Sequence, residues 1–166
     1  MTISDRSSRG ERDDASGPAI AELIHARLGW EAAETAVVPD EAATIGETLV
    51  DWADRLGLDL ILTTGGTGFA PRDVTPEATR AVLERETPGI PEALRAASLK
   101  ITPHAMLSRA VAGIRGRTLI INLPGSPKAV KENLEVLFPI LPHALELLRD
   151  SPEAEAGHRV THERRA

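Results

Sequence analysis

A glycine-rich stretch that follows a short apolar run is the part of this sequence best suited to chemistry. It reads Thr-Thr-Gly-Gly-Thr-Gly-Phe-Ala-Pro-Arg-Asp-Val-Thr-Pro over residues 63–76. Glycines let backbone N–H groups approach an anion closely, and a carboxylate beside such amides can hold a divalent metal. The stretch therefore predicts a site for a phosphate-bearing ligand.

Neither of the two commonest phosphate-binding motifs is present. In a dinucleotide pattern G-x-G-x-x-G starting at Gly66, the last glycine position holds Pro71, and no Gly-Lys pair exists for a Walker A loop. An isolated Gly-Gly-Thr-Gly turn is also compatible with a simple tight connection between a strand and a helix. The Pro-Arg-Asp-Val-Thr-Pro that follows it favours a functional loop.

Two acids that lie far apart in the sequence are the candidate metal ligands. Asp40 follows an apolar run at residues 35–38, and Asp73 stands beside the glycine stretch. Carboxylates without His or Cys neighbours suit a hard cation such as Mg²⁺, which also takes phosphate oxygens and water. Each acid has a simpler role open to it: Asp40 as a helix N-cap, and Asp73 as a loop acid paired with Arg72.

The elements that must position these residues alternate between strand and helix. Short apolar runs predict strands at residues 35–38, 58–64, 109–114 and 117–123, and the turn Arg115-Gly116 predicts that the last two form an antiparallel hairpin. Helical spacing of apolar residues predicts helices near 18–28, 40–56, 76–85, 91–98 and 129–148, the last broken near Pro139 and Pro142. This order predicts an α/β fold: a three-layer sandwich with a mostly parallel central sheet, plus a small β-hairpin element.

Ligands of open α/β sheets bind beyond the carboxyl ends of the strands. Four segments follow predicted strands and are expected to converge there: Ser4-Asp5, Val38-Pro39-Asp40, the glycine loop with Asp73, and Asn122-Leu123-Pro124-Gly125. Several of their polar residues have a local alternative. Asn122 can cap the turn at Pro124 instead of contacting a ligand, and Ser16, Thr75 and Ser126 stand at positions typical of helix caps.

Composition limits the classes of function. The 166 residues contain no cysteine, which excludes disulfides and thiolate metal sites. A net charge of −6 and only two Phe, two Trp and no Tyr disfavour a nucleic-acid partner. No apolar run approaches the roughly 20 residues that span a bilayer. We therefore expect a cytoplasmic protein with no membrane association.

The two ends of the chain differ from the rest. Residues 1–150 are expected to form one domain, whereas residues 151–166 are polar, lack apolar periodicity and are expected to be a disordered tail. A first strand that ends at Ser4-Asp5 would be shorter than the roughly five or six residues of an average strand. Either this strand is short, or its start lies upstream of Met1.

Several motifs occur in one order along the chain. They are GGTGFAPRDVTPEAT, Glu86-Thr87-Pro88-Gly89, Pro103-His104-Ala105-Met106-Leu107-Ser108-Arg109, Gly113-Ile114-Arg115-Gly116 and Asn122-Leu123-Pro124-Gly125-Ser126-Pro127. Together they resemble the molybdopterin adenylyltransferase family, over about residues 4–150. The resemblance implies that residues 1–150 form one molybdopterin- and ATP-binding catalytic domain. That family includes free-standing bacterial enzymes and the G domains of gephyrin and of the plant molybdenum cofactor protein.

The resemblance implies an activity and roles for individual residues. The activity is transfer of AMP from ATP to molybdopterin, giving adenylylated molybdopterin and pyrophosphate. The implied roles are as follows: Asp40 and Asp73 are catalytic and bind Mg²⁺, Ser108 is catalytic and lies on the pterin side, Gly65, Gly66, Thr67 and Gly68 bind the nucleotide, and Ser4, Asp5, Asn122, Pro124 and Gly125 bind molybdopterin.

The resemblance also implies partners and leaves alternatives. It implies a homotrimer that hands its product to a separate molybdate-inserting enzyme. A non-catalytic molybdopterin-binding or scaffolding module of the same fold is the main alternative, and the presence of both Asp40 and Asp73 speaks against it. A dinucleotide-dependent oxidoreductase is disfavoured by the failed glycine fingerprint.

Overall fold

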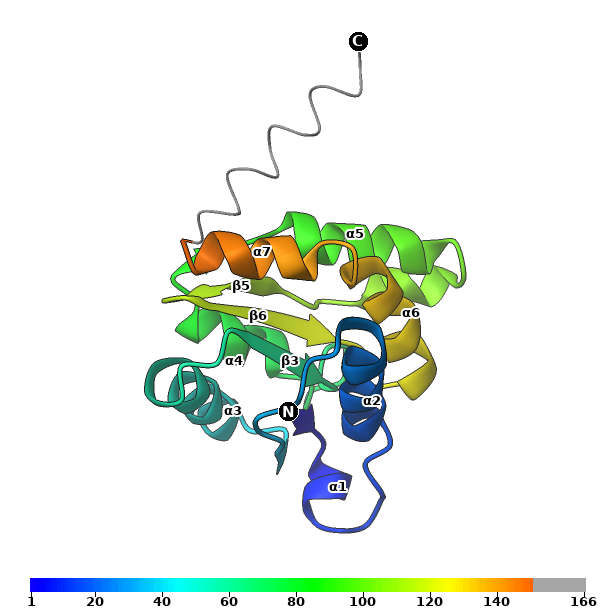
Figure 1. The fold of residues 1–166 in the computed structure, drawn as a ribbon. Helices are drawn as coiled ribbons and strands as arrows, with labels where there is room; N and C mark the ends of the chain where they lie inside the picture. The colour runs from blue at the N-terminus through cyan, green and yellow to red at the C-terminus, as the bar shows by residue number, and fades with distance from the viewer. Residues whose placement is uncertain (151–166) are drawn as a thin grey trace.

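A six-stranded mixed sheet forms the centre of the computed structural model, which describes residues 1–150 (Figure 1). The strand order is β2-β1-β3-β6-β5-β4. Pairing is parallel from β2 to β6 and antiparallel for β6-β5 and β5-β4. The strands are β1 (Thr2–Ile3), β2 (Val37–Val38), β3 (Leu60–Thr64), β4 (Arg85–Glu86), β5 (Ala112–Arg115) and β6 (Thr118–Leu123). The predicted mostly parallel sheet and its β-hairpin, closed by the pair Arg115↔Thr118, are confirmed.

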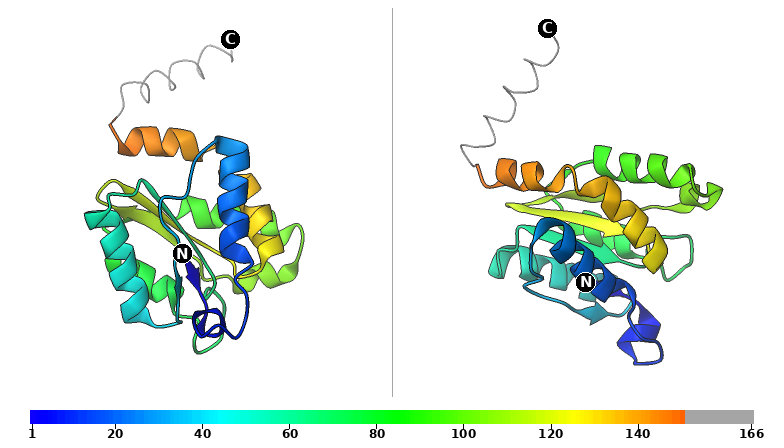
Figure 2. Two further views of the ribbon diagram at one scale, coloured as in Figure 1. Left: turned by 60° about the horizontal axis from the view of Figure 1, so that its bottom comes forward. Right: turned by 45° about the vertical axis from the view of Figure 1, so that its right-hand side comes forward.

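Helices cover both faces of the sheet, as the two views of Figure 2 show. The helices are α1 (Asp5–Ser8), α2 (Ser16–Leu28), α3 (Ala42–Val50), α4 (Thr75–Val82), α5 (Gly89–Leu99), α6 (Pro127–Leu137) and α7 (Leu141–Leu148), with a π-helical turn η1 (Asp51–Arg55) and a 3-10 turn η2 (Pro103–Leu107). One apolar cluster joins α2, α5, α6 and α7 to one face of the sheet. A second joins α3, η1 and α4 to the other face, which completes the three layers.

The central strands are apolar on both sides because both sides are covered. Alternate residues of β6 belong to different clusters: Leu119 and Ile121 pack with α6, whereas Ile120 packs with α3. Every residue of β6 is buried. Such strands carry continuous apolar runs rather than the alternation of a half-exposed strand. For this reason the continuous apolar runs in the sequence predict these central strands.

Several local expectations were wrong at their boundaries. The strand expected at 35–38 is reduced to Val37–Val38, and β5 begins at Ala112 rather than near residue 109. The helix expected over 40–56 begins at Ala42 and changes to a π-helical turn at Asp51. The predicted break near Pro139 is confirmed, because α6 ends at Leu137 and α7 begins at Leu141.

The expected helix caps also differ in detail. Thr75 lies inside α4, whose N-cap is Val74, and its hydroxyl donates to the carbonyl of Gly65 at 3.0 Å. Ser16 lies inside α2 and donates to the carbonyl of Gly125, so its hydroxyl joins two loops instead of capping. Ser126 is the N-cap residue of α6, but no hydrogen bond of its side chain caps the helix.

Within residues 1–150, no helix has the length and apolar character needed to cross a membrane. The tail expected at residues 151–166 lies outside the described part of the chain.

Candidate active site

The loops that follow β3 and β6 touch through their backbones. The N–H of Gly65 donates to the carbonyl of Leu123 at 3.3 Å, and the hydroxyl of Thr64 donates to the carbonyl of Pro124 at 2.6 Å. A Cβ added to Gly125 would lie 3.3 Å from the Cα of Gly65. The loop of residues 65–68, called here the nucleotide loop after the ligand expected for it, and the Pro124-Gly125 segment, expected to bind molybdopterin, are therefore neighbours.

The first two glycines of the nucleotide loop are required by its shape. Gly65 and Gly66 have φ angles of 100° and 62°, in the left-handed region that side chains disfavour. A Cβ on Gly65 would lie 2.2 Å from the carbonyl oxygen of Ile3, and one on Gly66 would lie 2.3 Å from the hydroxyl of Thr75. The loop is therefore held tightly against β1 and the start of α4.

Asp40 lies against this loop. Its Oδ1 is 3.0 Å from the position that a Cβ of Gly66 would take. Its Oδ2 accepts the N–H of Asp5 at 2.8 Å, and its own N–H donates to the Asp5 carboxylate at 3.1 Å. The N-cap residue of α3 is Glu41, so the N-cap role left open for Asp40 is not the one it has.

Asp73 follows the same loop, and its carboxylate lies near Gly68, two residues after Gly66. Its Oδ2 is 2.9 Å from the position that a Cβ of Gly68 would take, and it accepts the N–H of Ala70 at 2.8 Å. The alternative pairing with Arg72 is wrong. Arg72 donates twice to the carboxylate of Asp5 instead, at 2.8 and 2.9 Å.

The pKa of the Asp40 carboxyl is raised above its ordinary value. Burial raises the pKa of Asp40, the hydrogen bond from the Asp5 N–H opposes that rise, and the charges of the Asp5 and Asp73 carboxylates add to it. The pKa of Asp5 is lowered, first by its hydrogen bond from Arg72. Two like charges within mutual reach are the arrangement that a divalent cation stabilises.

The donor set fits Mg²⁺ better than a transition metal. Among residues 1–150, no group of three or more His, Cys, Asp or Glu side chains is arranged to hold a metal. Asp40 and Asp73 supply carboxylate oxygens, and Mg²⁺ usually binds one or two carboxylates while phosphate oxygens and water complete its shell. The two acids therefore suit a cation that arrives with a phosphate-bearing substrate.

Arg109 fastens the nucleotide loop, a role that the sequence did not reveal. Its backbone N–H donates to the carbonyl of Thr67 at 2.9 Å, and its Nε donates to the carbonyl of Gly68 at 2.7 Å. The same guanidinium donates to the carbonyl of Asp73 and to the carboxylate of Glu77. The only signal available was its position directly after Ser108 in a motif of the family.

The structure places Ser108, Thr67 and Ser4 near the same loops. Ser108 precedes Arg109, whose N–H bonds to Thr67, so Ser108 stands beside the nucleotide loop. Thr67 is 6% exposed. Ser4 is the N-cap of α1, where its hydroxyl accepts the N–H of Ser7.

Asn122 is the predicted site residue that departs most from its expected place. Its side chain is 1% exposed, accepts the N–H of Val111, and donates to the hydroxyls of Thr63 and Thr79. Both the oxygen and the nitrogen of its amide are thus used inside the protein. The structure gives Asn122 a role in holding β3, α4 and the segment before β5 together, rather than the turn cap that the sequence left open.

Comparison with known proteins shows the family to which the chain belongs. A family model described as a probable molybdopterin binding domain matches residues 1–143. The chain is 42% identical to the molybdopterin adenylyltransferase of Escherichia coli (strain K12), covering 99% of this chain and 94% of that protein. It is 45% identical to the molybdopterin adenylyltransferase of Helicobacter pylori (strain J99), covering 89% of this chain and 85% of that protein.

A larger relative and a solved structure extend the comparison. The chain is 50% identical to the gephyrin of Dictyostelium discoideum over 93% of its own length, but it spans only 23% of that protein. The crystal structure of the molybdopterin biosynthesis enzyme MoaB from Thermus thermophilus matches with a TM-score of 0.85 and 56% identity, covering 91% of this chain and 94% of that one. The chain therefore belongs to the molybdopterin-binding domain family that contains the bacterial molybdopterin adenylyltransferases.

Proposed function

We propose that this chain is a molybdopterin adenylyltransferase, which transfers AMP from ATP to the terminal phosphate of molybdopterin and releases pyrophosphate. The observation that supports the proposal is that the carboxylates of Asp40 and Asp73 both lie against the loop of residues 65–68. Asp40 lies against Gly66 and Asp73 against Gly68, and the charge of Asp73 acts on the pKa of Asp40.

The nucleotide side of the site is the loop from Gly65 to Gly68. Its glycines leave the backbone open to an approaching phosphate chain, and the hydroxyl of Thr67 is a further donor. Asp40 and Asp73 would hold Mg²⁺, which when bound supplies positive charge to the phosphates of ATP. Arg109 keeps this loop in place through the carbonyls of Thr67, Gly68 and Asp73.

The pterin side is formed by the neighbouring loops. Ser4 and Asp5 follow β1, Pro124 and Gly125 follow β6, and Ser108 stands next to the nucleotide loop. Hydroxyl and backbone groups are suitable partners for the pterin ring and for the phosphate of molybdopterin. In this proposal Asn122 is a positioning residue, because its side chain is occupied within the sheet.

The reaction joins two anions, so the protein acts mainly by positioning and charge neutralisation. An oxygen of the molybdopterin phosphate attacks the α-phosphorus of ATP, a new phosphoanhydride bond forms, and the bond to pyrophosphate breaks in line. The attacking phosphate is already ionised at neutral pH, so no general base is needed to activate it. The transfer is direct and needs no covalent intermediate on the protein.

The test measures binding and turnover separately. Purified protein with molybdopterin, ATP and Mg²⁺ should form adenylylated molybdopterin. Asp73→Asn should still bind molybdopterin but form product on the order of 100-fold more slowly. Asp51→Asn is the matched control, since Asp51 lies on η1 in a surface pair with Arg55. Wild-type protein that binds molybdopterin without turnover would instead establish the non-catalytic binding module.

Three further properties are proposed with this function: a homotrimer, delivery of product to a separate molybdate-inserting enzyme, and a cytoplasmic location. Light scattering tests the first of these. A stable monomer at micromolar concentration would exclude the trimer.

A further inference from the structure

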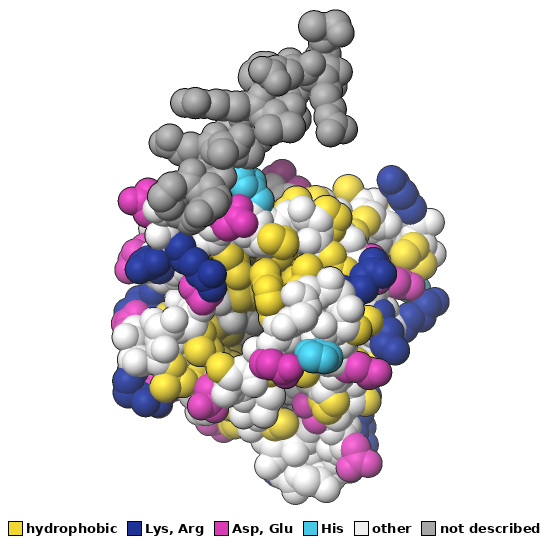
Figure 3. All heavy atoms as spheres, in the orientation of Figure 1, with side chains coloured by type: hydrophobic (Ala, Val, Ile, Leu, Met, Phe, Trp, Pro, Cys, Tyr) yellow, Lys and Arg dark blue, Asp and Glu magenta, His cyan; other side chains and the backbone are white. Residues whose placement is uncertain are grey.

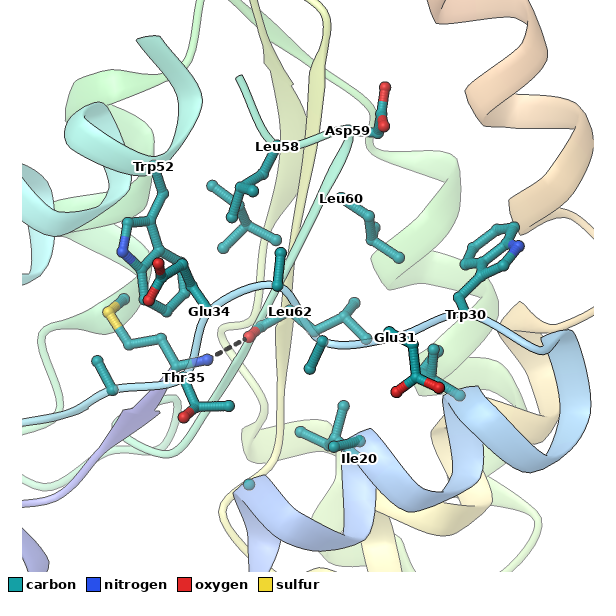
Figure 4. A pocket seen from close by; sticks show the side chains of 18 of the residues that line it. Ile20, Trp30, Glu31, Glu34, Thr35, Trp52, Leu58, Asp59, Leu60 and Leu62 are labelled. Atoms are coloured by element: carbon teal, nitrogen blue, oxygen red, sulfur yellow. Dashed lines mark hydrogen bonds between the residues drawn. The ribbon is translucent and has the colours of Figure 1, made fainter. Parts of the chain in front are cut away.

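An apolar cavity of about 750 Å³ lies beside β3, and the described residues that line it do not include the proposed metal ligands. Ile20 of α2 and Leu60 and Leu62 of β3 face this cavity, as Figure 4 shows. Figure 3 shows hydrophobic side chains gathered around a hollow on this face of the molecule. Asp40 and Asp73 lie instead on loops that follow β2 and β3, so the polar contacts of those loops decide where the two acids lie.

Arg72 precedes Asp73 in the sequence but extends its side chain to the loop after β1. Its Nη2 donates to Oδ1 of Asp5 at 2.8 Å, and its Nε donates to Oδ2 at 2.9 Å. Two hydrogen bonds between one guanidinium and one carboxylate fix the orientation of both groups, which a single contact does not. The segment that carries Asp73 is therefore fastened to Asp5, which is distant in sequence.

Asp5 is in turn joined to Asp40. The N–H of Asp40 donates to Oδ1 of Asp5 at 3.1 Å, and this is the oxygen that also accepts the Nη2 of Arg72. In the other direction, the N–H of Asp5 donates to Oδ2 of Asp40 at 2.8 Å. Arg72 and the backbone of Asp40 thus share one carboxylate oxygen, so a shift of the Asp5 side chain disturbs both contacts.

The nucleotide loop closes a ring of contacts. Asp40 lies against Gly66 of this loop, and Arg72 follows the loop in the sequence. The ring runs from Asp40 along the loop to Arg72, through Asp5, and back to Asp40. The pair of Arg72 and Asp5 is a contact between two side chains, whereas each hydrogen bond between Asp5 and Asp40 uses a backbone N–H. A substitution at Arg72 therefore opens the ring without removing a backbone donor.

The ion pair in this ring is partly open to water. The side chain of Arg72 is 60% exposed and that of Asp5 is 23% exposed. Exposed ion pairs add little to the free energy of unfolding, because water screens their charges. The effect of Arg72 is therefore local: it decides where Asp5 and Asp40 lie rather than whether the chain folds.

We propose that Arg72 is a positioning residue of the reaction site, which acts through Asp5 to set the placement of the Asp40 carboxylate relative to that of Asp73 and so fits both acids to one divalent cation. The proposal rests on the proposed function, since it takes these two acids as the metal ligands. Arg72 carries a positive charge and is not itself a ligand.

Arg72 has two effects of opposite sign on a bound cation. Its charge repels the cation, so loss of the charge by itself strengthens binding. Its hydrogen bonds hold Asp5 and, through it, Asp40, so loss of these bonds weakens binding. Lysine keeps the charge but lacks the planar fork that reaches both oxygens of Asp5. Arg72→Lys therefore isolates the positioning effect.

The experiment titrates the protein with Mn²⁺ alone, as a paramagnetic substitute for Mg²⁺, and measures the Kd by electron paramagnetic resonance. Arg72→Lys should raise this Kd about tenfold, which is the usual effect of changing a residue that orients a metal ligand. Arg55→Lys is the matched control, because Arg55 also donates from Nε and Nη2 to one carboxylate, that of Asp51. The control should keep the Kd of the wild type.

Hydrogen exchange supplies a readout that needs no metal. The N–H of Asp5, which donates to Asp40, should exchange about tenfold faster in Arg72→Lys, while urea denaturation gives the stability of the wild type. A double variant tests the route of the effect. Once Asp5→Asn has broken the ion pair, Arg72→Lys should raise the Kd by less than about twofold, because coupled residues are not additive.

Three results would overturn the proposal. Arg72→Lys with the Kd and the Asp5 exchange rate of the wild type would show that the fork is not needed. A tenfold rise in Kd that persists beside Asp5→Asn would mean that Arg72 acts by another route. Wild-type protein that binds Mn²⁺ no more tightly than Asp73→Asn would contradict the shared cation. No measurement uses ATP, molybdopterin or turnover, so a lack of adenylyl transfer would contradict the proposed function and leave these results as they are.

Discussion

Asp5 and Asp40 exchange hydrogen bonds: the N–H of each residue donates to the carboxylate of the other, at 2.8 and 3.1 Å. The pair joins the loop after β1 to the loop after β2. It holds the carboxylate of Asp40 against Gly66, while Arg72 donates to both oxygens of the Asp5 carboxylate. The charge of one proposed metal ligand is thus fixed in place by a residue on the proposed pterin side.

The first prediction concerns the charge of Asp40. Asp40→Asn keeps an oxygen that can accept the Asp5 N–H but removes a carboxylate whose pKa is raised by burial. We expect product formation to fall on the order of 100-fold while the free energy of unfolding is unchanged or rises. Urea denaturation and an adenylylation assay on the same sample check both. A variant that keeps full activity would remove Asp40 from the proposed metal site.

The second prediction concerns Gly66. Gly66→Ala places a Cβ 2.3 Å from the Thr75 hydroxyl at a φ of 62°, whereas Gly10→Ala faces open space at a φ of 72°. Backbone strain alone costs about 1–2 kcal/mol, so Gly10→Ala should lose that much. Gly66→Ala should lose clearly more stability and nearly all ATP binding. Equal losses in the two variants, measured by urea denaturation, would show that the close approach to Thr75 is unimportant.

The third prediction concerns Arg109 as a positioning residue. Lysine keeps the charge but lacks the fork that reaches Gly68, Asp73 and Glu77 together. Arg109→Lys should raise the KM for ATP more than it lowers kcat, and should speed hydrogen exchange in residues 67–70. Arg9→Lys, in a surface pair with Glu11, is the control. A fall in kcat with unchanged KM and exchange would point to direct contact with the reacting phosphates instead.

The fourth prediction concerns the amino group of Met1 and pH. Its pKa is about 6 when folded against about 8 in the unfolded chain, so the unfolded state binds more protons between these values. Stability should therefore rise with pH from 6 to 8, by about 2–3 kcal/mol from this group. Acetylation of the amino group removes its charge and should remove that part of the slope. The measurement is the difference between acetylated and free protein in urea denaturation at pH 5.5, 7 and 8.5.

Much of the fold could be predicted because its central strands are apolar on both faces and its turns carry glycine or proline. Asp40 and Asp73 were expected at one edge of the sheet because each comes after a parallel strand, and their carboxylates lie against Gly66 and Gly68 of one loop. The identities of the substrates could not be read from that edge. They came from the family motifs, because carboxylates and glycines indicate phosphate and a cation but no particular base or pterin.

The residues whose roles differ from the sequence prediction share a physical cause. Their contacts with residues distant in sequence outweigh the local preference. The pattern Thr75-Pro76 is typical of a helix cap, yet both the N–H and the hydroxyl of Thr75 bond to the glycine loop. Arg109 reaches carbonyls some forty positions away in sequence, which no periodicity encodes. Tertiary context of this kind decides the partners of polar side chains more often than those of apolar ones, because a polar side chain has several hydrogen-bond partners of similar energy.

The internal hydrogen bonds of Asn122 limit how substrate preference can be altered. Its amide group joins Thr63, just before the nucleotide loop, to Thr79 of α4 and to Val111, and it stands two residues before Pro124. Replacing this one side chain would disturb both halves of the reaction centre together. Selectivity for a different nucleotide or a different pterin must therefore be engineered in the exposed loop residues, with this internal anchor left as it is.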